Sequence, residues 1–256
     1  MPAAGQPADA GTFAATVDAL EDLGFDSLWL SERIGGPNPD PIVGLAVAAG
    51  RTTRMKLGTS VQVLPGRNPA LLAQSLASLD VLSGGRFLPG FGLGGVDPHE
   101  QQAFGVRREE RAPLFDEVVP LLRRIWTEDA VTHAGPRYTY TDLRVRPRPV
   151  QRPPDIWFGG RAPSELRRVG RLSDGWLASF TMPEECAAGR VVIEATAAEH
   201  GRRMDPEHYG AMVFAADGPL PDELAALIAR RNPEVDPHVL IPAGLDRKST
   251  RLNSSH

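Results

Sequence analysis

The sequence predicts an α/β fold of the (β/α)8 TIM-barrel type, in which parallel strands form the wall and helices cover it. From residue 11 onward, segments with helical spacing of apolar residues alternate with short β-rich segments. Prolines and glycines separate these segments. The length of 256 residues matches a single barrel, which runs to roughly 250 residues.

Before residue 92 the helices and strands alternate without interruption. The first helix carries Phe13, Val17 and Leu20 at helical spacing, and Gly24 directly after it is a typical end signal. Pro41 opens the second helix, at a position where proline is favoured. The expected elements are helices at 11–23, 41–53 and 69–82 and strands at 25–30, 55–64 and 86–91.

After residue 92 the alternation returns, following one irregular segment. A helix at 109–126 has an apolar face, and residues 132–145 then alternate aromatic and polar side chains. Prolines at 147, 149, 153 and 154 interrupt regular structure, so we expect an insertion near residues 131–150 and not a second domain. The later elements are strands at 155–158, 175–179 and 209–215 and helices at 163–172, 183–204 and 221–231.

This reading gives six strands, whereas a closed barrel of this type has eight. Residues 1–9 are rich in Ala, Gly and Pro and contain no β-branched residue, so we expect the opening strand to be missing. Residues 246–256 depart from the composition of the rest, and we expect either a segment foreign to the protein or a disordered tail. A single domain is therefore expected over residues 1–245.

The composition excludes several classes of partner. The formal net charge is -4 and the charged residues are interspersed, so we expect no nucleic acid partner. No run approaches the roughly 18 apolar residues of a membrane span, so we expect no membrane partner. Cys186 is the only cysteine, which excludes an internal disulfide and a multi-cysteine metal site. We expect a cytoplasmic protein without a bound metal.

Residues that follow the strands are the candidates for chemistry, because the active site of such a barrel lies at the C-terminal ends of its strands. Ser31, Glu32 and Arg33 follow the first strand. A buried Glu32 gains a raised pKa and can serve as a general acid or base; alternatively, it forms an Arg–Glu pair that holds a loop. His99, in the loop after a later strand, is the second catalytic candidate.

Two glycine-rich segments are candidates for contact with a cofactor. Gly92 and Gly94 lie at a strand end, where small residues let a flat ring approach the backbone; the alternative is a tight turn. The segment is not a dinucleotide fingerprint, because a proline and a charged loop follow it in place of a helix. Gly159, Gly160 and Arg161 precede a helix, whose free N–H groups favour a phosphate; the alternative is a structural turn.

Three segments resemble the bacterial luciferase-like superfamily, whose members use FMN or coenzyme F420. They are LGFDSLW (residues 23–29), RTTRMKLGTSVQVLPGRNPALLAQSLASLDVLSGGRFLPGFGLGG (residues 51–95) and RPPDIWFGGRAPSELRRVGRLSDGWLAS (residues 152–179). The resemblance covers residues 11–245. It implies a strand before the first helix and a last helix and strand after VLIPAGL (residues 239–245), and both are absent here. The first and last strands of a barrel are neighbours, so we expect one gap in its wall.

The resemblance also implies how the site is arranged. In the family a cis peptide bond occurs at the register of Ser60 and Val61, in a bulge that presses on one face of the flavin or deazaflavin ring. Ser31 is expected to contact the cofactor. Where the family often has a histidine after the acidic residue, this sequence has Arg33. The cofactor phosphate is expected at residues 159–161.

The resemblance predicts a redox enzyme that transfers a hydride between coenzyme F420 and a small organic substrate. The alternative is an FMN-dependent monooxygenase that works with a separate flavin reductase. A third reading, from a different class of function, is a non-catalytic flavin-binding relative or an inactive fragment. The resemblance further implies a homodimer with contacts near the second and third helices.

Overall fold

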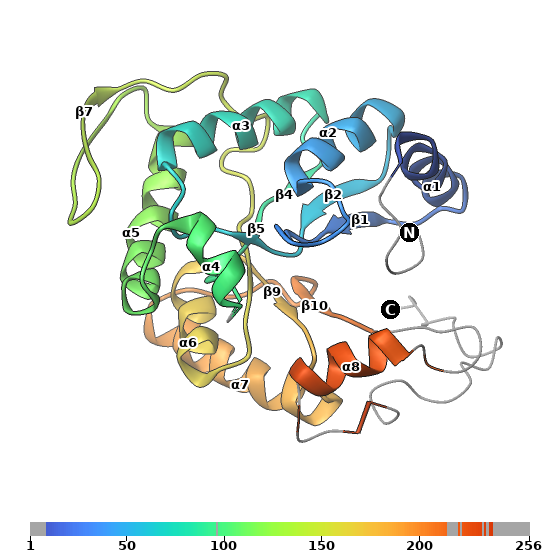
Figure 1. The fold of residues 1–256 in the computed structure, drawn as a ribbon. Coiled ribbons are helices and arrows are strands. Elements are labelled where there is room, and N and C mark those ends of the chain that lie inside the picture. Colours follow the sequence, from blue (N-terminus) through green and yellow to red (C-terminus); the bar gives the residue numbers. More distant parts are fainter. Residues whose placement is uncertain are drawn as a thin grey trace.

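The structure is a computed structural model in which strands form an inner wall and helices lie outside it (Figure 1). It describes residues 9–213 apart from Val96, together with residues 220, 222–231, 233, 236 and 237. The expectations for residues 239–245 and for the tail at 246–256 lie outside the described residues. Within the described residues, no helix combines the length and the apolar character that crossing a bilayer requires.

Across the described residues, the wall consists of six strands, two of which are interrupted. β2 (Lys56–Thr59) and β3 (Gln62–Val63) are successive pieces of one strand, and β4 (Phe87–Leu88) and β5 (Gly90–Gly92) are pieces of another. The others are β1 (Ser27–Leu30), β8 (Trp157–Gly159), β9 (Gly175–Ala178) and β10 (Tyr209–Ala211). The hydrogen-bonded orders are β1-β2-β4 and β10-β9-β8-β5-β3, and each of these pairs is parallel.

This strand order confirms the predicted barrel. Strands that follow one another along the chain are neighbours in the wall, as βα units require. Among the described residues, β1 and β10 have no strand on their outer edges, so the expected opening lies between the first and last of the six strands. The carboxyl ends of the strands therefore meet at one mouth of the barrel, although its wall is open.

Most helices follow the bounds expected from the sequence. They are α1 (Ala10–Asp22), α2 (Pro41–Arg51), α3 (Pro69–Leu82), α5 (Arg108–Thr127), α6 (Pro163–Leu172), α7 (Pro183–Glu199) and α8 (Asp222–Arg231). Asp40 and Asn68 cap the helices that begin with Pro41 and Pro69, and each accepts hydrogen bonds from two backbone N–H groups of the first turn. The helix expected to reach residue 204 ends earlier, and Gly201 lies just beyond it with a positive φ of 64°.

The expectation of a charged loop after the glycine-rich strand end was wrong. A short helix, α4 (Pro98–Phe104), forms there. The Asp97 carboxylate accepts a hydrogen bond of 2.9 Å from the His99 N–H, which caps the helix, and Gly105 ends it in the left-handed conformation with φ 58°. An Asp-Pro start and a glycine end are readable helix signals, and they outweigh the charge of the segment.

The segment expected to be an insertion forms an antiparallel hairpin of β6 (Val131–Ala134) and β7 (Thr139–Leu143). The hairpin stands apart from the barrel wall, beside α3 and α5 (Figure 1). Glu117 of α5 joins it to the helix, because its Oε1 lies 3.0 Å from His133 Nε2 and accepts a hydrogen bond of 3.2 Å from the Tyr138 N–H. The hairpin therefore belongs to the outer surface of the barrel.

The core fills the barrel wall and the inner faces of the helices. Trp126, Trp157 and Trp176 are 2%, 7% and 3% exposed, so these three tryptophans are core residues. Arg86 lies directly before β4. It connects the C-terminal ends of α2 and α3 to the segment before β2. Its guanidinium donates hydrogen bonds to the carbonyl oxygens of Ala49, Thr52, Met55 and Ser83, at 2.7 to 3.1 Å.

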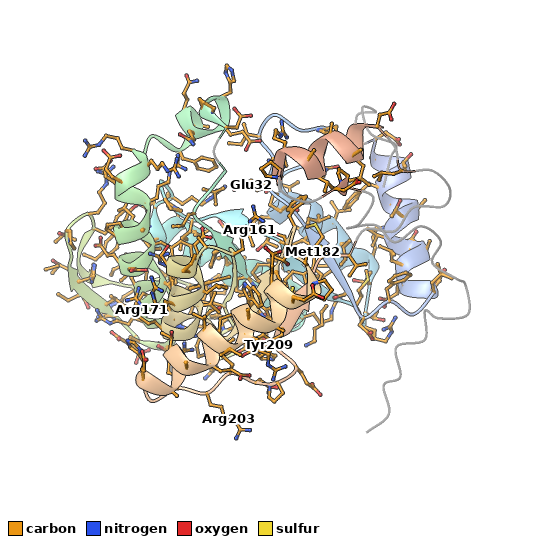
Figure 2. All side chains as sticks on the ribbon, turned by 90° about the horizontal axis from the view of Figure 1, so that it is seen from below. Glu32, Arg161, Arg171, Met182, Arg203 and Tyr209 are labelled. Atoms are coloured by element: carbon orange, nitrogen blue, oxygen red, sulfur yellow. The ribbon has the colours of Figure 1, made fainter. Side chains whose placement is uncertain are left out.

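We predict that Arg86→Met lowers the free energy of unfolding by about 2–4 kcal/mol, because several buried carbonyl groups lose their partner at once. Urea denaturation measures the change. The control is Arg203→Met, at an exposed arginine that points away from the protein (Figure 2), and it should change stability by less than about 0.5 kcal/mol. Small and equal changes in both variants would contradict the role of Arg86.

Candidate functional site

The mouth of the barrel brings several of the predicted residues together around Val61. Ser60 and Val61 lie between β2 and β3, while Gly92 ends β5 and Gly159 ends β8. A Cβ atom on Gly92 would lie 2.6 Å from one methyl group of Val61, and a Cβ on Gly159 would lie 3.1 Å from the other. The two glycines therefore give Val61 the space to lie between their strands.

The predicted cis peptide bond between Ser60 and Val61 is confirmed. Neighbouring backbone holds this segment on one side: the Ser60 N–H donates to the Leu30 carbonyl at 2.9 Å, and the Glu32 N–H donates to the Val61 carbonyl at 3.3 Å. The Ser31 hydroxyl donates to the Ser60 carbonyl at 2.6 Å. The end of β1 is thus joined to the interruption between β2 and β3, and Ser31 lies beside it.

Glu32 lies beneath this segment as a buried carboxylate. Its side chain is 7% exposed, its Oε2 accepts a 2.7 Å hydrogen bond from the Val63 N–H, and its Oε1 pairs with Arg67. Burial raises the pKa of Glu32 above its ordinary value, while the Val63 N–H and Arg67 oppose the rise. The partner is Arg67 and not the adjacent Arg33, whose guanidinium lies 3.8 Å from Glu100. Glu32 therefore holds the end of β3 in place.

Gly94 belongs to the same end of the barrel but contacts a different residue. It has φ 91°, a conformation that favours glycine, and a Cβ there would lie 3.2 Å from a methyl group of Val63. The buried Arg111 donates a 3.2 Å hydrogen bond to the Gly95 carbonyl. These contacts show a closely packed turn, which is the structural alternative for this segment.

The segment Gly159–Gly160–Arg161 precedes α6 as expected, but its backbone donors already have a partner. The N–H groups of Arg161 and Ala162 donate to Glu165 Oε2 at 3.0 and 2.9 Å. Gly160 has φ 118°, and its carbonyl accepts a 2.8 Å hydrogen bond from the Trp176 indole. Sequence reasoning missed Glu165, although an acidic residue three positions after the N-cap is a known capping pattern.

The Arg161 side chain extends from this turn toward the strand end of β9. Its Nη1 donates a 3.2 Å hydrogen bond to the carbonyl of Phe180, two residues past that strand. The residue is exposed and directly precedes Ala162, the N-cap of α6. The guanidinium of Arg161 therefore connects the turn before α6 to the segment that follows β9.

The second catalytic candidate, His99, lies in a different place from Glu32. It is exposed near the start of α4 and lines a pocket of about 400 Å³, together with Arg33 and Arg230. Glu32 does not line this pocket. The two predicted catalytic residues are therefore not brought into one site, and Arg230 of α8 was not among the predicted residues.

Comparison with known proteins assigns the chain to a family. The family model described as luciferase-like monooxygenase matches residues 1–235. An F420-dependent glucose-6-phosphate dehydrogenase of Kineococcus radiotolerans is 34% identical over 65% of this chain and 52% of its own. A putative coenzyme F420-dependent oxidoreductase of Mycobacterium tuberculosis is 30% identical over 86% of this chain and 65% of its own. The chain thus spans about half the length of several curated relatives that it matches.

Solved structures agree with this assignment. A monooxygenase from Streptomyces bottropensis superimposes with a TM-score of 0.74 at 28% identity, over 86% of this chain and 71% of the other. The F420-dependent tetrahydromethanopterin reductase from Methanopyrus kandleri, at 24% identity and a TM-score of 0.70 over 80% of this chain and 62% of the other, shares the fold. Because the family model matches most of its length, the chain belongs to the luciferase-like monooxygenase family.

Proposed function

We propose that the chain is the barrel of an oxidoreductase that moves a hydride between coenzyme F420 and a small organic substrate. The observation that carries the proposal is the position of Val61, whose methyl groups lie between the strand-end glycines Gly92 and Gly159 at the mouth of the barrel. Its branched, partly buried side chain offers a firm apolar surface against which a flat ring can rest. The F420-dependent relatives support the choice of cofactor.

The residues around Val61 have the chemistry that such a cofactor needs. Ser31 and Ser60 offer polar groups at the edge of the apolar surface, and Gly92 lets Val61 take its position there. Gly159, Gly160 and Arg161 are the proposed phosphate site, and the turn at Gly94 is a further proposed contact. Bound F420 would accept or donate the hydride, while the chain supplies binding, orientation and exclusion of water. Glu32 is proposed to exchange a proton at its buried carboxyl group, and His99 is the second candidate for that role.

The Glu165 carboxylate limits the ways in which a phosphate can bind at the start of α6. It carries a negative charge and accepts hydrogen bonds from two N–H groups that face the proposed phosphate. A phosphate must therefore either displace this carboxylate or bind through Gly160 and the Arg161 side chain. In both cases the negative charge of Glu165 opposes binding.

An FMN-dependent monooxygenase is the second candidate function. The similarity to the Streptomyces bottropensis monooxygenase, at 28% identity over 86% of this chain, favours it. This function would require a flavin reductase as partner. A non-catalytic flavin-binding relative or an inactive fragment is the third candidate. Cofactor titration separates the inactive fragment from the other two, and turnover with bound cofactor separates the non-catalytic relative.

A homodimer through α2 and α3 is also proposed. Val43 and Val47 of α2 and Leu71 of α3 are 61%, 47% and 67% exposed, which is unusual for large apolar side chains on one face. A second copy covering this surface would bury them. The single cysteine, Cys186, supports the proposed cytoplasmic location.

We predict that coenzyme F420 binds at least about tenfold more tightly than FMN, which corresponds to about 1.4 kcal/mol. Fluorescence titration of the purified protein with each compound measures the two dissociation constants. Tighter binding of FMN would favour the monooxygenase. Binding of neither compound would overturn both enzymatic proposals for this chain.

We predict opposite effects for two substitutions at the start of α6. Arg161→Ala should weaken cofactor binding by about 1.5–3 kcal/mol, because a charge-assisted contact with the phosphate is lost. Glu165→Gln should strengthen binding, because a negative charge beside the phosphate is removed. Arg167→Ala, at an exposed arginine of the same helix, is the control and should leave the affinity unchanged. Equal affinities for all variants would contradict a phosphate site at this helix.

We predict that Glu32→Gln lowers kcat by about 10²-fold or more while the cofactor still binds, as expected for the loss of a proton-transferring group. The pH profile should also lose the limb that reports the raised pKa of this carboxyl group. Steady-state turnover over a range of pH tests both points. His99→Gln is measured in parallel, and a larger loss in this variant would transfer the proton-transfer role to His99.

A further inference from the structure

A pocket of about 400 Å³ lies between the loop that follows β1, the helix α4 and the helix α8. It is separate from the surface around Val61, since neither Val61 nor the glycines at 159 and 160 line it. Its volume suits a small organic molecule. The lining residues are Arg33, Ile34, Gly35, Gly36, Pro37, Asn38, Asp97, His99, Glu100 and Arg230.

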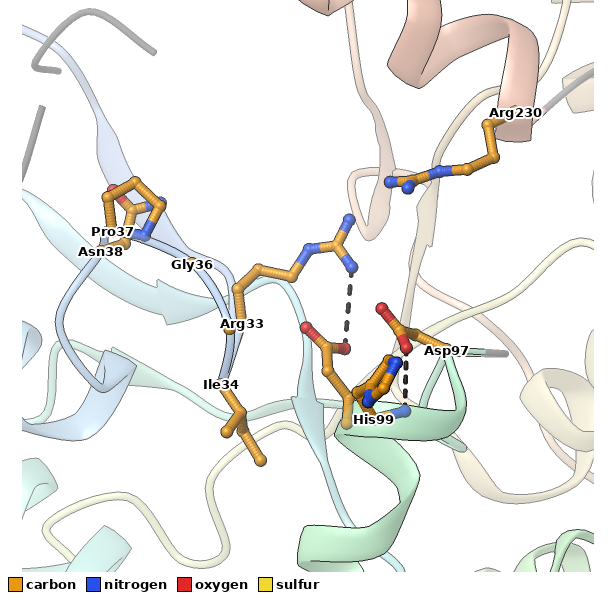
Figure 3. A pocket seen from close by; sticks show the side chains of 10 residues that line it. Arg33, Ile34, Gly36, Pro37, Asn38, Asp97, His99 and Arg230 are labelled. Carbon is orange, nitrogen blue, oxygen red and sulfur yellow. Dashed lines mark hydrogen bonds and ion pairs between the residues drawn. The ribbon is translucent and has the colours of Figure 1, made fainter. Parts of the chain in front are cut away.

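Two arginines from distant parts of the chain meet at this pocket. Figure 3 shows the guanidinium groups of Arg33 and Arg230 pointing toward one another across the open space. Like charges that face each other are unfavourable unless a negative group lies between or beside them. An arrangement of two planar guanidinium groups also matches the geometry with which arginine binds carboxylates and phosphates.

Two carboxylates, Asp97 and Glu100, also line the pocket, so the formal charges of its lining balance, but neither carboxylate forms a close ion pair with Arg230. Glu100 approaches Arg33 to 3.8 Å, which is beyond the range of a hydrogen bond. Asp97 accepts a 2.9 Å hydrogen bond from the His99 N–H and thereby caps α4. Among the described residues, Arg230 has no acidic partner within ion-pair distance. Within the described part of the chain, the Arg230 guanidinium therefore has no carboxylate in direct contact with it.

We propose that this pocket binds the anionic group of the substrate, a carboxylate or a phosphate ester, between Arg33 and Arg230. The proposal deepens the proposed function and rests on it, because it names the substrate class of the same enzyme. Glu100 occupies the position beside Arg33 when no anion is bound and moves away from it when one is. His99 forms the neighbouring polar wall (Figure 3).

Anion binding tests this proposal without turnover. Inorganic phosphate and acetate are titrated calorimetrically into the Arg161→Ala protein, in which the other proposed anion site is removed. Arg33→Gln and Arg230→Gln, each made in this background, should weaken binding at least tenfold. Glu100→Gln should strengthen it several-fold, a gain that a misfolded protein would not show. Arg203→Gln, at the exposed arginine used as control above, should have no effect.

The outcomes separate this proposal from the proposed function. Tighter phosphate binding identifies a phosphate ester as the substrate class, and tighter acetate binding identifies a carboxylate. Wild-type affinity in both Arg33→Gln and Arg230→Gln, or binding of neither anion to the Arg161→Ala protein, overturns the anion pocket. Because this readout needs no F420 or FMN, failure of cofactor binding would overturn the proposed function and leave the anion pocket standing.

Discussion

The contact between Thr59 and Gly90 is the constraint on which the mouth of the barrel depends. The Thr59 hydroxyl donates to the Gly90 carbonyl and accepts from the Gly90 N–H, both at 2.8 Å, and Thr59 is fully buried. A Cβ on Gly90 would overlap the carbonyl oxygen of Thr59, so only glycine permits this approach. The contact lies where both interrupted strands change from one piece to the next. It keeps them in register, and Val61 can therefore lie beside Gly92 and Gly159.

Two carboxylates, those of Glu32 and Glu165, fix the loops around the proposed site in position. Glu32 connects the end of β3 to Arg67, and Glu165 connects the backbone before α6 to its first turn. Each satisfies N–H groups that would otherwise be unpaired near the barrel mouth. The loops are thereby held in position before a ligand arrives. The same carboxylates repel anions that bind close to them. The loops are therefore rigid, but the binding of an anion beside them costs electrostatic free energy.

The proposed substrate pocket and the proposed cofactor surface are built from different parts of the fold. The proposed cofactor surface is built from strand ends, whereas the pocket is built from the loop after β1 and from α4 and α8, which lie outside the wall. Such peripheral segments vary more freely than strand ends on a constant scaffold.

The sequence by itself determined the elements and their order, because helix caps, proline positions and apolar spacing are local properties. It indicated the six parallel strands, and the resemblance located the cis peptide bond at Ser60 and Val61. Only the tertiary structure decided which charged side chains lie opposite one another. Glu32 binds Arg67 and not the adjacent Arg33, and Arg230 faces Arg33 from a helix nearly two hundred residues away. Such pairs depend on how the wall curves and where its loops return, because neighbouring residues of an extended segment point to opposite sides.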